Sequence, residues 1–176
     1  QIFRYLHEAL GGALGPMLVL SVIGGGWGSF GFVPLLAWNR TRRFGVALAG
    51  VVVTTALAVF VLKRLFGRVR PFNSIPNIHA INPPADFSFP SGHSAGSFAF
   101  AVFVAIVLVK TKGPTARPLA ALLVLLAVGV GLSRIALGVH YPGDVLAGAL
   151  LGSAIAIVGA RIYSQNDAST NQPKAQ

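Results

Sequence analysis

The chain has 176 residues, enough for one domain, of which 54% are hydrophobic and only 10% charged, against roughly 25% charged in soluble domains. So large an apolar excess excludes a disordered chain, and a soluble globule of this composition would expose apolar patches and aggregate. The 14 Lys and Arg against 4 Asp and Glu give a net charge of +10. A nucleic-acid binder carries its basic residues on a polar surface, whereas here they lie in short clusters between apolar runs. The sequence therefore predicts an integral membrane protein.

The predicted elements are all helices, and five of them are apolar enough to cross a membrane. Residues 1–16 predict a short amphipathic helix that lies on the membrane surface. The five predicted spans follow at residues 17–38, 44–62, 94–109, 118–132 and 145–160. The fold class is therefore all-α, a multi-pass transmembrane helical bundle. We expect residues 1–163 to form one membrane-embedded domain and the polar residues 164–176 a disordered tail.

The basic residues divide between two sides of this predicted bundle. One side collects eight of them: Arg40, Arg42, Arg43, Lys110, Lys112, Arg117, Arg161 and Lys174. The other side collects six: Arg4, Lys63, Arg64, Arg68, Arg70 and Arg134. The positive-inside rule makes the first side cytoplasmic and the second side the outer face.

The first of three polar clusters on the outer side contains Lys63 and Arg70. These bases are seven residues apart, so two helical turns would place both on one face before Pro71 ends the helix. The structural alternative is a basic collar at the lipid interface.

The second cluster is the sequence Pro-Ser-Gly-His at residues 90–93, immediately before an apolar span. Ser91 is a good N-cap, and the free N–H groups of a helix start suit an anion. Gly92 would let a phosphate approach the backbone, and His93 would be a proton donor beside it. The structural alternative is a capped helix with an interfacial histidine.

The third cluster contains Ser133, Arg134, His140 and Asp144. Pro142 suits the first turn of the last span, so the carboxylate of Asp144 would reach back to His140. A carboxylate that holds one imidazole tautomer leaves the other nitrogen free to attack. An ionisable cluster at a membrane boundary is costly, so a purely structural role is the less favoured interpretation here.

Metal chemistry is not expected from the remaining residues. A Mg²⁺ or Ca²⁺ site needs several carboxylates, and the chain has four acids, no Cys and four scattered His. We therefore predict no metal and no other cofactor. Asp144 is the one acid that we assign to chemistry; His79 and Asp86, in the 72–89 loop, are near the site in sequence but are not assigned to it.

In order and spacing, the three clusters resemble the three-part signature of the type-2 phosphatidic acid phosphatase superfamily, over a match from about Val22 to Arg161. The resemblance implies that His140 is a nucleophile that forms a phosphohistidine, with Asp144 orienting it. It implies that His93 is first the general acid and then the base that activates water. The phosphate-binding set that it implies is Lys63, Arg70, Ser91, Gly92 and Arg134. Membrane members of the family have six spans, so a sixth would precede Gln1.

The function expected from this resemblance is hydrolysis of a lipid phosphate or diphosphate on the outer face of a bacterial inner membrane. The implied substrates are phosphatidylglycerol phosphate, phosphatidate, undecaprenyl diphosphate and lipid A. The expected partners are this lipid and the bilayer; oligomeric state is left open. Two alternatives stay open, a lipid phosphotransferase and a non-catalytic lipid-binding or transport protein. Vanadium haloperoxidases share the site chemistry, but they are soluble, so the apolar spans disfavour them.

Overall fold

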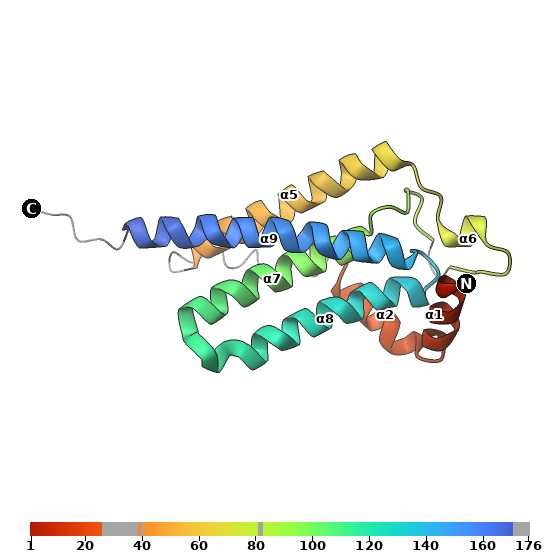
Figure 1. The fold of residues 1–176 in the computed structure, drawn as a ribbon, viewed down its shortest axis with the longest axis horizontal. Helices are drawn as coiled ribbons and strands as arrows, with labels where there is room; N and C mark the ends of the chain where they lie inside the picture. Colours follow the sequence, from red (N-terminus) through yellow and green to blue (C-terminus); the bar gives the residue numbers. More distant parts are fainter. Residues whose placement is uncertain (26–38, 40, 81–82, 171–176) are drawn as a thin grey trace, which may run out of the picture.

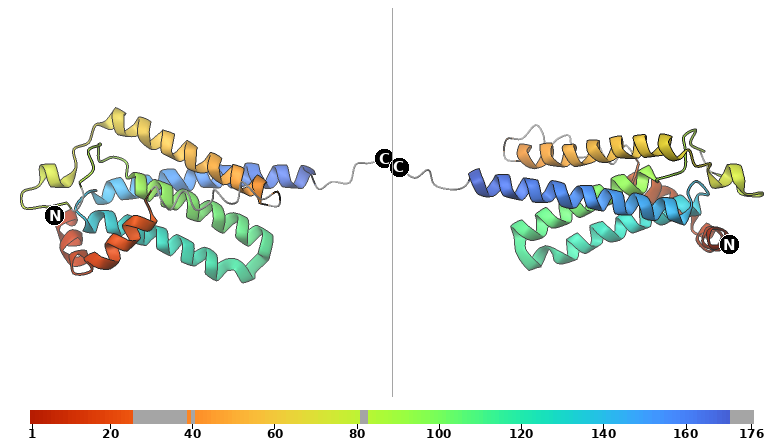
Figure 2. Two further views of the ribbon diagram at one scale, coloured as in Figure 1. Left: turned by 180° about the vertical axis from the view of Figure 1, so that it is seen from behind. Right: turned by 45° about the horizontal axis from the view of Figure 1, so that its top comes forward.

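The computed structural model describes residues 1–25, 39, 41–80 and 83–170, which form helices and connecting turns with no strand among them. Four long helices run side by side (Figures 1 and 2). They are α5 (Arg42–Phe66), α7 (Gly92–Lys112), α8 (Arg117–Ala136) and α9 (Pro142–Thr170). The shorter elements are α1 (Ile2–Gly11), α2 (Leu14–Ile23), α6 (Pro71–Ser74) and the 3-10 helix η2 (Gly113–Ala116). The all-α prediction is confirmed.

Helix α7 occupies the centre of the bundle, where it contacts α5, α8 and α9. Its Phe103 is fully buried in a core to which α5 contributes Leu48 and α9 contributes Ala156. Helices α7 and α9 pack closely against each other. A Cβ on Gly152 would overlap the carbonyl of Ala95, so the small residue is what allows the two backbones to meet.

Within the described residues, three stretches are long and apolar enough to cross a membrane, namely Arg42–Ser74, Gly92–Ala136 and Pro142–Gln165. The second of them turns back at η2, so that α7 and α8 lie antiparallel (Figure 1). The last four predicted spans thus correspond to α5, α7, α8 and α9, each longer than its apolar run because caps and prolines, not hydrophobicity, set helix ends. The number of spans predicted, five, stays a prediction.

The N-terminal residues form two helices that meet at an angle of 104°. The amphipathic α1 packs on the end of α8, where His7 Nδ1 lies 3.2 Å from the Ile135 carbonyl oxygen and Phe3 packs edge-on against Tyr141. Helix α2 also packs on α8. The predicted first span, 17–38, overlaps α2 from residue 17 to Ile23, and its part from residue 26 onward lies outside the described residues.

The C-terminal end of α9 extends into the predicted tail. Residues 164–170, expected to be disordered, continue the helix to Thr170. Ser164 Oγ donates to the Ala160 carbonyl (2.8 Å) and accepts from Lys110 Nζ (3.1 Å), so this part of α9 contacts the end of α7. Residues 171–176 lie outside the described residues.

The direction of each helix places the polar clusters at one end of the bundle. Helices α5 and α8 run one way and α7 and α9 the other (Figure 1). The helix ends with Arg42, Lys110, Arg117 and Arg161 therefore share one end, as the charge pattern predicted. The opposite end holds all three candidate clusters.

Candidate active site

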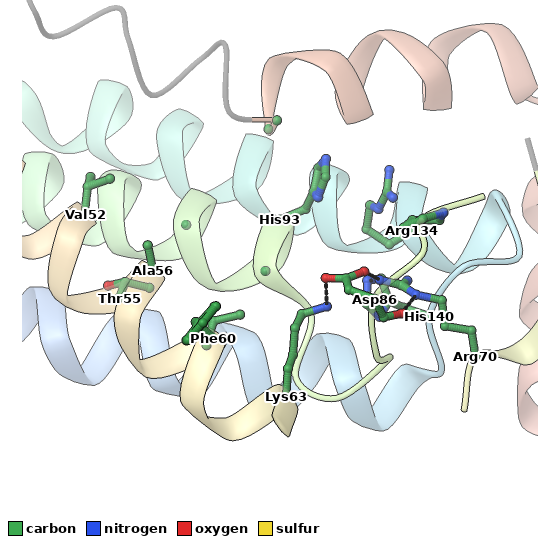
Figure 3. A pocket seen from close by; sticks show the side chains of 16 residues that line it. Val52, Thr55, Ala56, Phe60, Lys63, Arg70, Asp86, His93, Arg134 and His140 are labelled. Atoms are coloured by element: carbon green, nitrogen blue, oxygen red, sulfur yellow. Dashed lines mark hydrogen bonds and ion pairs between the residues drawn. The ribbon is translucent and has the colours of Figure 1, made fainter. Parts of the chain in front are cut away.

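A pocket of about 400 Å³ opens where the three clusters meet (Figure 3). Six of the eight predicted site residues line it: Lys63, Arg70, Gly92, His93, Arg134 and His140. The other two lie behind its wall and are fully buried. Ser91 is the N-cap of α7, with its Oγ 3.4 Å from the backbone nitrogen of Ser94, and Asp144 stands behind His140.

Asp144 is fixed by several hydrogen bonds in the first turn of α9. Its Oδ2 lies 3.6 Å from His140 Nδ1 and accepts from Ser88 Oγ (2.5 Å) and from the backbone nitrogen of Tyr141 (2.9 Å). The carboxylate is thereby aimed at the imidazole. This arrangement is the one expected from the spacing of His140 and Asp144 around Pro142, which begins the helix as predicted.

The opposite ring nitrogen of His140 faces the pocket. Its Nε2 lies 3.2 Å from Arg70 Nη1, and because a guanidinium only donates, Nε2 must be the acceptor and carry a lone pair. The proton then sits on Nδ1, toward Asp144 and Ser88. Burial lowers the pKa of His140 to about 4; Asp144 opposes the shift, and the positive charges of Arg70, Arg134 and Lys63 add to it. The ring is therefore neutral at pH 7.

Three buried cations line the same pocket as this nitrogen. The side chains of Lys63 and Arg70 are pinned by main-chain carbonyls: Lys63 Nζ donates to Phe87 (2.5 Å), and Arg70 Nη1 donates to Val139 (2.8 Å). Arg134 donates from Nη1 to Ser21 Oγ of α2, whereas its buried Nε has no hydrogen-bond partner among the described residues. An unsatisfied buried donor beside two other cations is a feature that an anionic ligand would complete.

Asp86 belongs to the site, which corrects the expectation that Asp144 alone of the acids would take part. Its carboxylate pairs with Lys63 Nζ (2.7 Å) and Arg70 Nη2 (2.5 Å), as the dashed lines in Figure 3 show. Burial by itself raises the pKa of Asp86, but the hydrogen bonds from Lys63 and Arg70 outweigh it and leave the pKa below its ordinary value. The sequence does contain one indication of this role, since Asp86 is the single acid of the 72–89 loop, which joins two of the clusters.

Arg68 and Ser88 are two further residues that the sequence interpretation did not assign to the site. Arg68 Nη1 donates to Asp144 Oδ1 (2.7 Å), and its guanidinium stacks over the ring of Tyr141. Ser88 donates its hydroxyl to the other oxygen of the same carboxylate, and its backbone nitrogen donates to the Arg68 carbonyl (2.8 Å). Both carboxylate oxygens of Asp144 are therefore held from outside the third cluster.

Lys63 and Arg70 do not lie on one helix, and that prediction is wrong. Helix α5 ends at Phe66 because Gly67 adopts the left-handed conformation (φ 56°), a common helix C-cap. Arg70 lies four residues beyond the helix end, in extended backbone at the start of α6. The turn at Gly67 directs Arg70 back over the pocket, and so the two bases still converge.

Apolar residues of one face of α5, together with Thr55, line a second part of the pocket. Val52, Ala56, Val59 and Phe60 recur at helical spacing from the level of Lys63 toward the middle of the helix (Figure 3). Phe60 lines the pocket while the residue is 53% exposed, so the apolar part reaches the outer surface of the bundle. The pocket thus joins a cationic end to an apolar trough.

Comparison with known proteins agrees with this architecture. The profile of the PAP2 superfamily matches residues 44–168, and the chain belongs to this superfamily. The resemblance to the type-2 phosphatidic acid phosphatases is thereby confirmed.

Individual relatives and solved structures extend the match. The chain is 36% identical over 131 residues to an undecaprenyl-diphosphatase of Sulfolobus acidocaldarius, covering 74% of this chain and 60% of the relative. It is 36% identical over 134 residues to a decaprenylphosphoryl-5-phosphoribose phosphatase of Mycobacterium tuberculosis, covering 76% and 69%. Its fold matches the PAP2 type phosphatidylglycerolphosphate phosphatase of Bacillus subtilis with a TM-score of 0.77 and 24% identity, covering 99% of this chain and 88% of that one. It also matches Aquifex aeolicus LpxE with a TM-score of 0.75 and 27% identity, covering 91% of this chain and 93% of that one.

Proposed function

We propose that this protein is an integral-membrane phosphatase that removes a terminal phosphate from a lipid phosphate or diphosphate through a phosphohistidine on His140. The observation that carries the proposal is a neutral Nε2 that faces three buried cations and is backed by a fully buried Asp144. A nucleophile, its orienting group and a cationic phosphate site meet in one pocket, which is what attack on phosphorus needs.

In the first step, Nε2 of His140 attacks phosphorus, and the bond to the lipid oxygen breaks as His93 donates a proton to that oxygen. In the second step, His93 removes a proton from water, the hydroxide attacks phosphorus, and the bond to Nε2 breaks. Lys63, Arg70 and Arg134 balance the charge of the equatorial oxygens, with the amide of Gly92 as a further donor at the N-terminus of α7. Ser91 supports that terminus as its cap. No metal is required for either step.

The apolar trough along α5 supports a lipid substrate, because it would hold a hydrocarbon chain while the phosphate sits among the cations. Relatives named for undecaprenyl diphosphate, decaprenylphosphoryl-5-phosphoribose and lipid A all act on phosphates carried by lipids. We place the reaction on the outer face of a bacterial inner membrane, from the distribution of basic residues. The candidate substrates are phosphatidylglycerol phosphate, phosphatidate, undecaprenyl diphosphate and lipid A.

The test is phosphate release by the purified protein from a panel of these four lipids, with EDTA present. We expect release from at least one lipid, inhibition by vanadate, and loss of release in His140→Ala, with His7→Ala as the matched control that keeps it. Strict dependence on added metal, or activity in His140→Ala, would contradict the mechanism. Phosphate that appears only on an added acceptor would identify a phosphotransferase instead.

A further inference from the structure

Asp86 poses a problem for the proposed function, on which this inference rests. Its carboxylate contacts Lys63 and Arg70, two of the three cations assigned to the phosphate. A phosphate that binds there must either displace this carboxylate or lie beside a like charge. The remaining cation, Arg134, lines the same pocket, and its Nε has no hydrogen-bond partner in the part of the chain that the structure describes.

The geometry lets the carboxylate leave without disturbing the cations. The main chain at this point is anchored separately, since the Asp86 carbonyl accepts from Arg70 Nε (2.7 Å) and the Phe87 carbonyl accepts from Lys63 Nζ (2.5 Å). The Asp86 side chain is 57% exposed and lies in neither a helix nor a strand. Rotation of this side chain alone would move its charge into water, while Lys63 and Arg70 stay in place.

The pocket is also open to lipids other than a substrate. Phe60 connects its apolar part to the outer surface of α5, where Leu57 and Val61 are exposed as well. Most bilayer phospholipids are phosphodiesters, with one negative charge on the phosphate. Three unopposed cations beside an apolar trough would attract these abundant lipids as well as a phosphomonoester.

We propose that Asp86 is a specificity-determining residue. Its carboxylate stays bound to Lys63 and Arg70 until a terminal phosphate with two negative charges displaces it. A phosphodiester, with one negative charge, does not displace the carboxylate and is excluded. A phosphodiester has the same single negative charge as the Asp86 carboxylate. The carboxylate binds in preference, because it is tethered beside Lys63 and Arg70 at a high effective concentration. A terminal phosphate carries close to two charges at pH 7, which strengthens its contact with Lys63, Arg70 and Arg134 together.

The test compares wild type, Asp86→Asn and the control Glu8→Gln, which removes an exposed carboxylate from α1 at the same end of the bundle. Phosphate release from a lipid phosphomonoester is measured in neutral detergent micelles with increasing phosphatidylglycerol. We expect phosphatidylglycerol to raise the apparent KM of Asp86→Asn about tenfold and to change wild type and Glu8→Gln less than about twofold. Equal sensitivity in all three proteins would overturn the proposal.

A second measurement does not depend on turnover. The Tm of each protein is recorded with dihexanoyl phosphatidylglycerol and with inorganic phosphate. Phosphate should raise the Tm of all three proteins, whereas the phosphodiester should raise that of Asp86→Asn alone. A phosphodiester response in wild type would overturn the role of Asp86. Absence of phosphate release from every lipid, with these Tm responses intact, would refute the proposed function and leave the anion selectivity standing.

Discussion

The contact between Arg68 and Asp144 makes a prediction that separates positioning from substrate binding. Arg68→Gln removes the 2.7 Å hydrogen bond to Asp144 Oδ1 and leaves those from Ser88 and Tyr141 to Oδ2. A hydrogen bond to a charged group contributes about 1.5–3 kcal/mol. The Arg68 side chain is 44% exposed, so water replaces part of it and the lower figure applies. A loss of about 1.5 kcal/mol in the transition state lowers kcat roughly tenfold.

The assay is steady-state phosphate release, with kcat and KM measured separately. Arg68 does not line the pocket, so KM should stay within about twofold, and Arg68→Lys should recover part of kcat by restoring the charge. Arg4→Gln, which removes an exposed base from α1 at the same end, is the control. A rise in KM at constant kcat would show that Arg68 binds phosphate directly. An increase in kcat would show that Arg68 weakens the grip of Asp144 on His140, and either result refutes the reasoning.

Three further predictions address stability, ionisation and topology. Gly152→Ala forces a Cβ against the Ala95 carbonyl and should destabilise the protein by about 1–3 kcal/mol in thermal unfolding. The control Gly50→Ala should be neutral or stabilising, because a Cβ there would have nothing within 4 Å. Equal Tm values for the two variants would contradict the close α7–α9 contact. Burial lowers the pKa of His140 to about 4, so the ring becomes charged only when the pH falls to near that value. Its NMR resonances should therefore titrate near pH 4. A transition near pH 6.5 would show that the ring is not buried and neutral. Protonation of this ring also opposes folding, so its contribution lowers stability as pH falls below about 6.5. The chain has no Cys, so Asn73→Cys, an exposed position in α6, should react with an impermeant thiol reagent from outside the cell; labelling from inside alone would reverse the orientation.

The sequence predicted the long helices and most of the polar pocket for identifiable reasons. Apolar runs longer than a helical turn define α5, α7, α8 and α9, and local cap chemistry at Ser91 and Pro142 places His93 and Asp144 at helix starts. These features depend on neighbours within a few residues. The relative positions of His140 and Asp144 could be predicted from the sequence for the same reason.

The features that the sequence did not predict depend on long-range contacts or on backbone conformation. Asp86 and Arg68 join the site through partners 16 to 76 residues away, which spacing alone does not reveal. The end of α5 at Gly67, and not at Pro71, follows from a left-handed glycine, and helical spacing between Lys63 and Arg70 was the wrong premise. The contact of Ser21 with Arg134 likewise depends on how α2 packs on α8.

The central claim is that His140 carries the phosphoryl group, and the most direct measurement traps it there. His93→Ala is mixed with p-nitrophenyl phosphate, whose phenolate leaves without a proton donor, so the first step proceeds and the second lacks its base. We expect an intact protein heavier by one phosphoryl group, with the group located on His140 by mass spectrometry under basic conditions. Phosphate on another residue, or turnover with no phosphorylated protein, would contradict it.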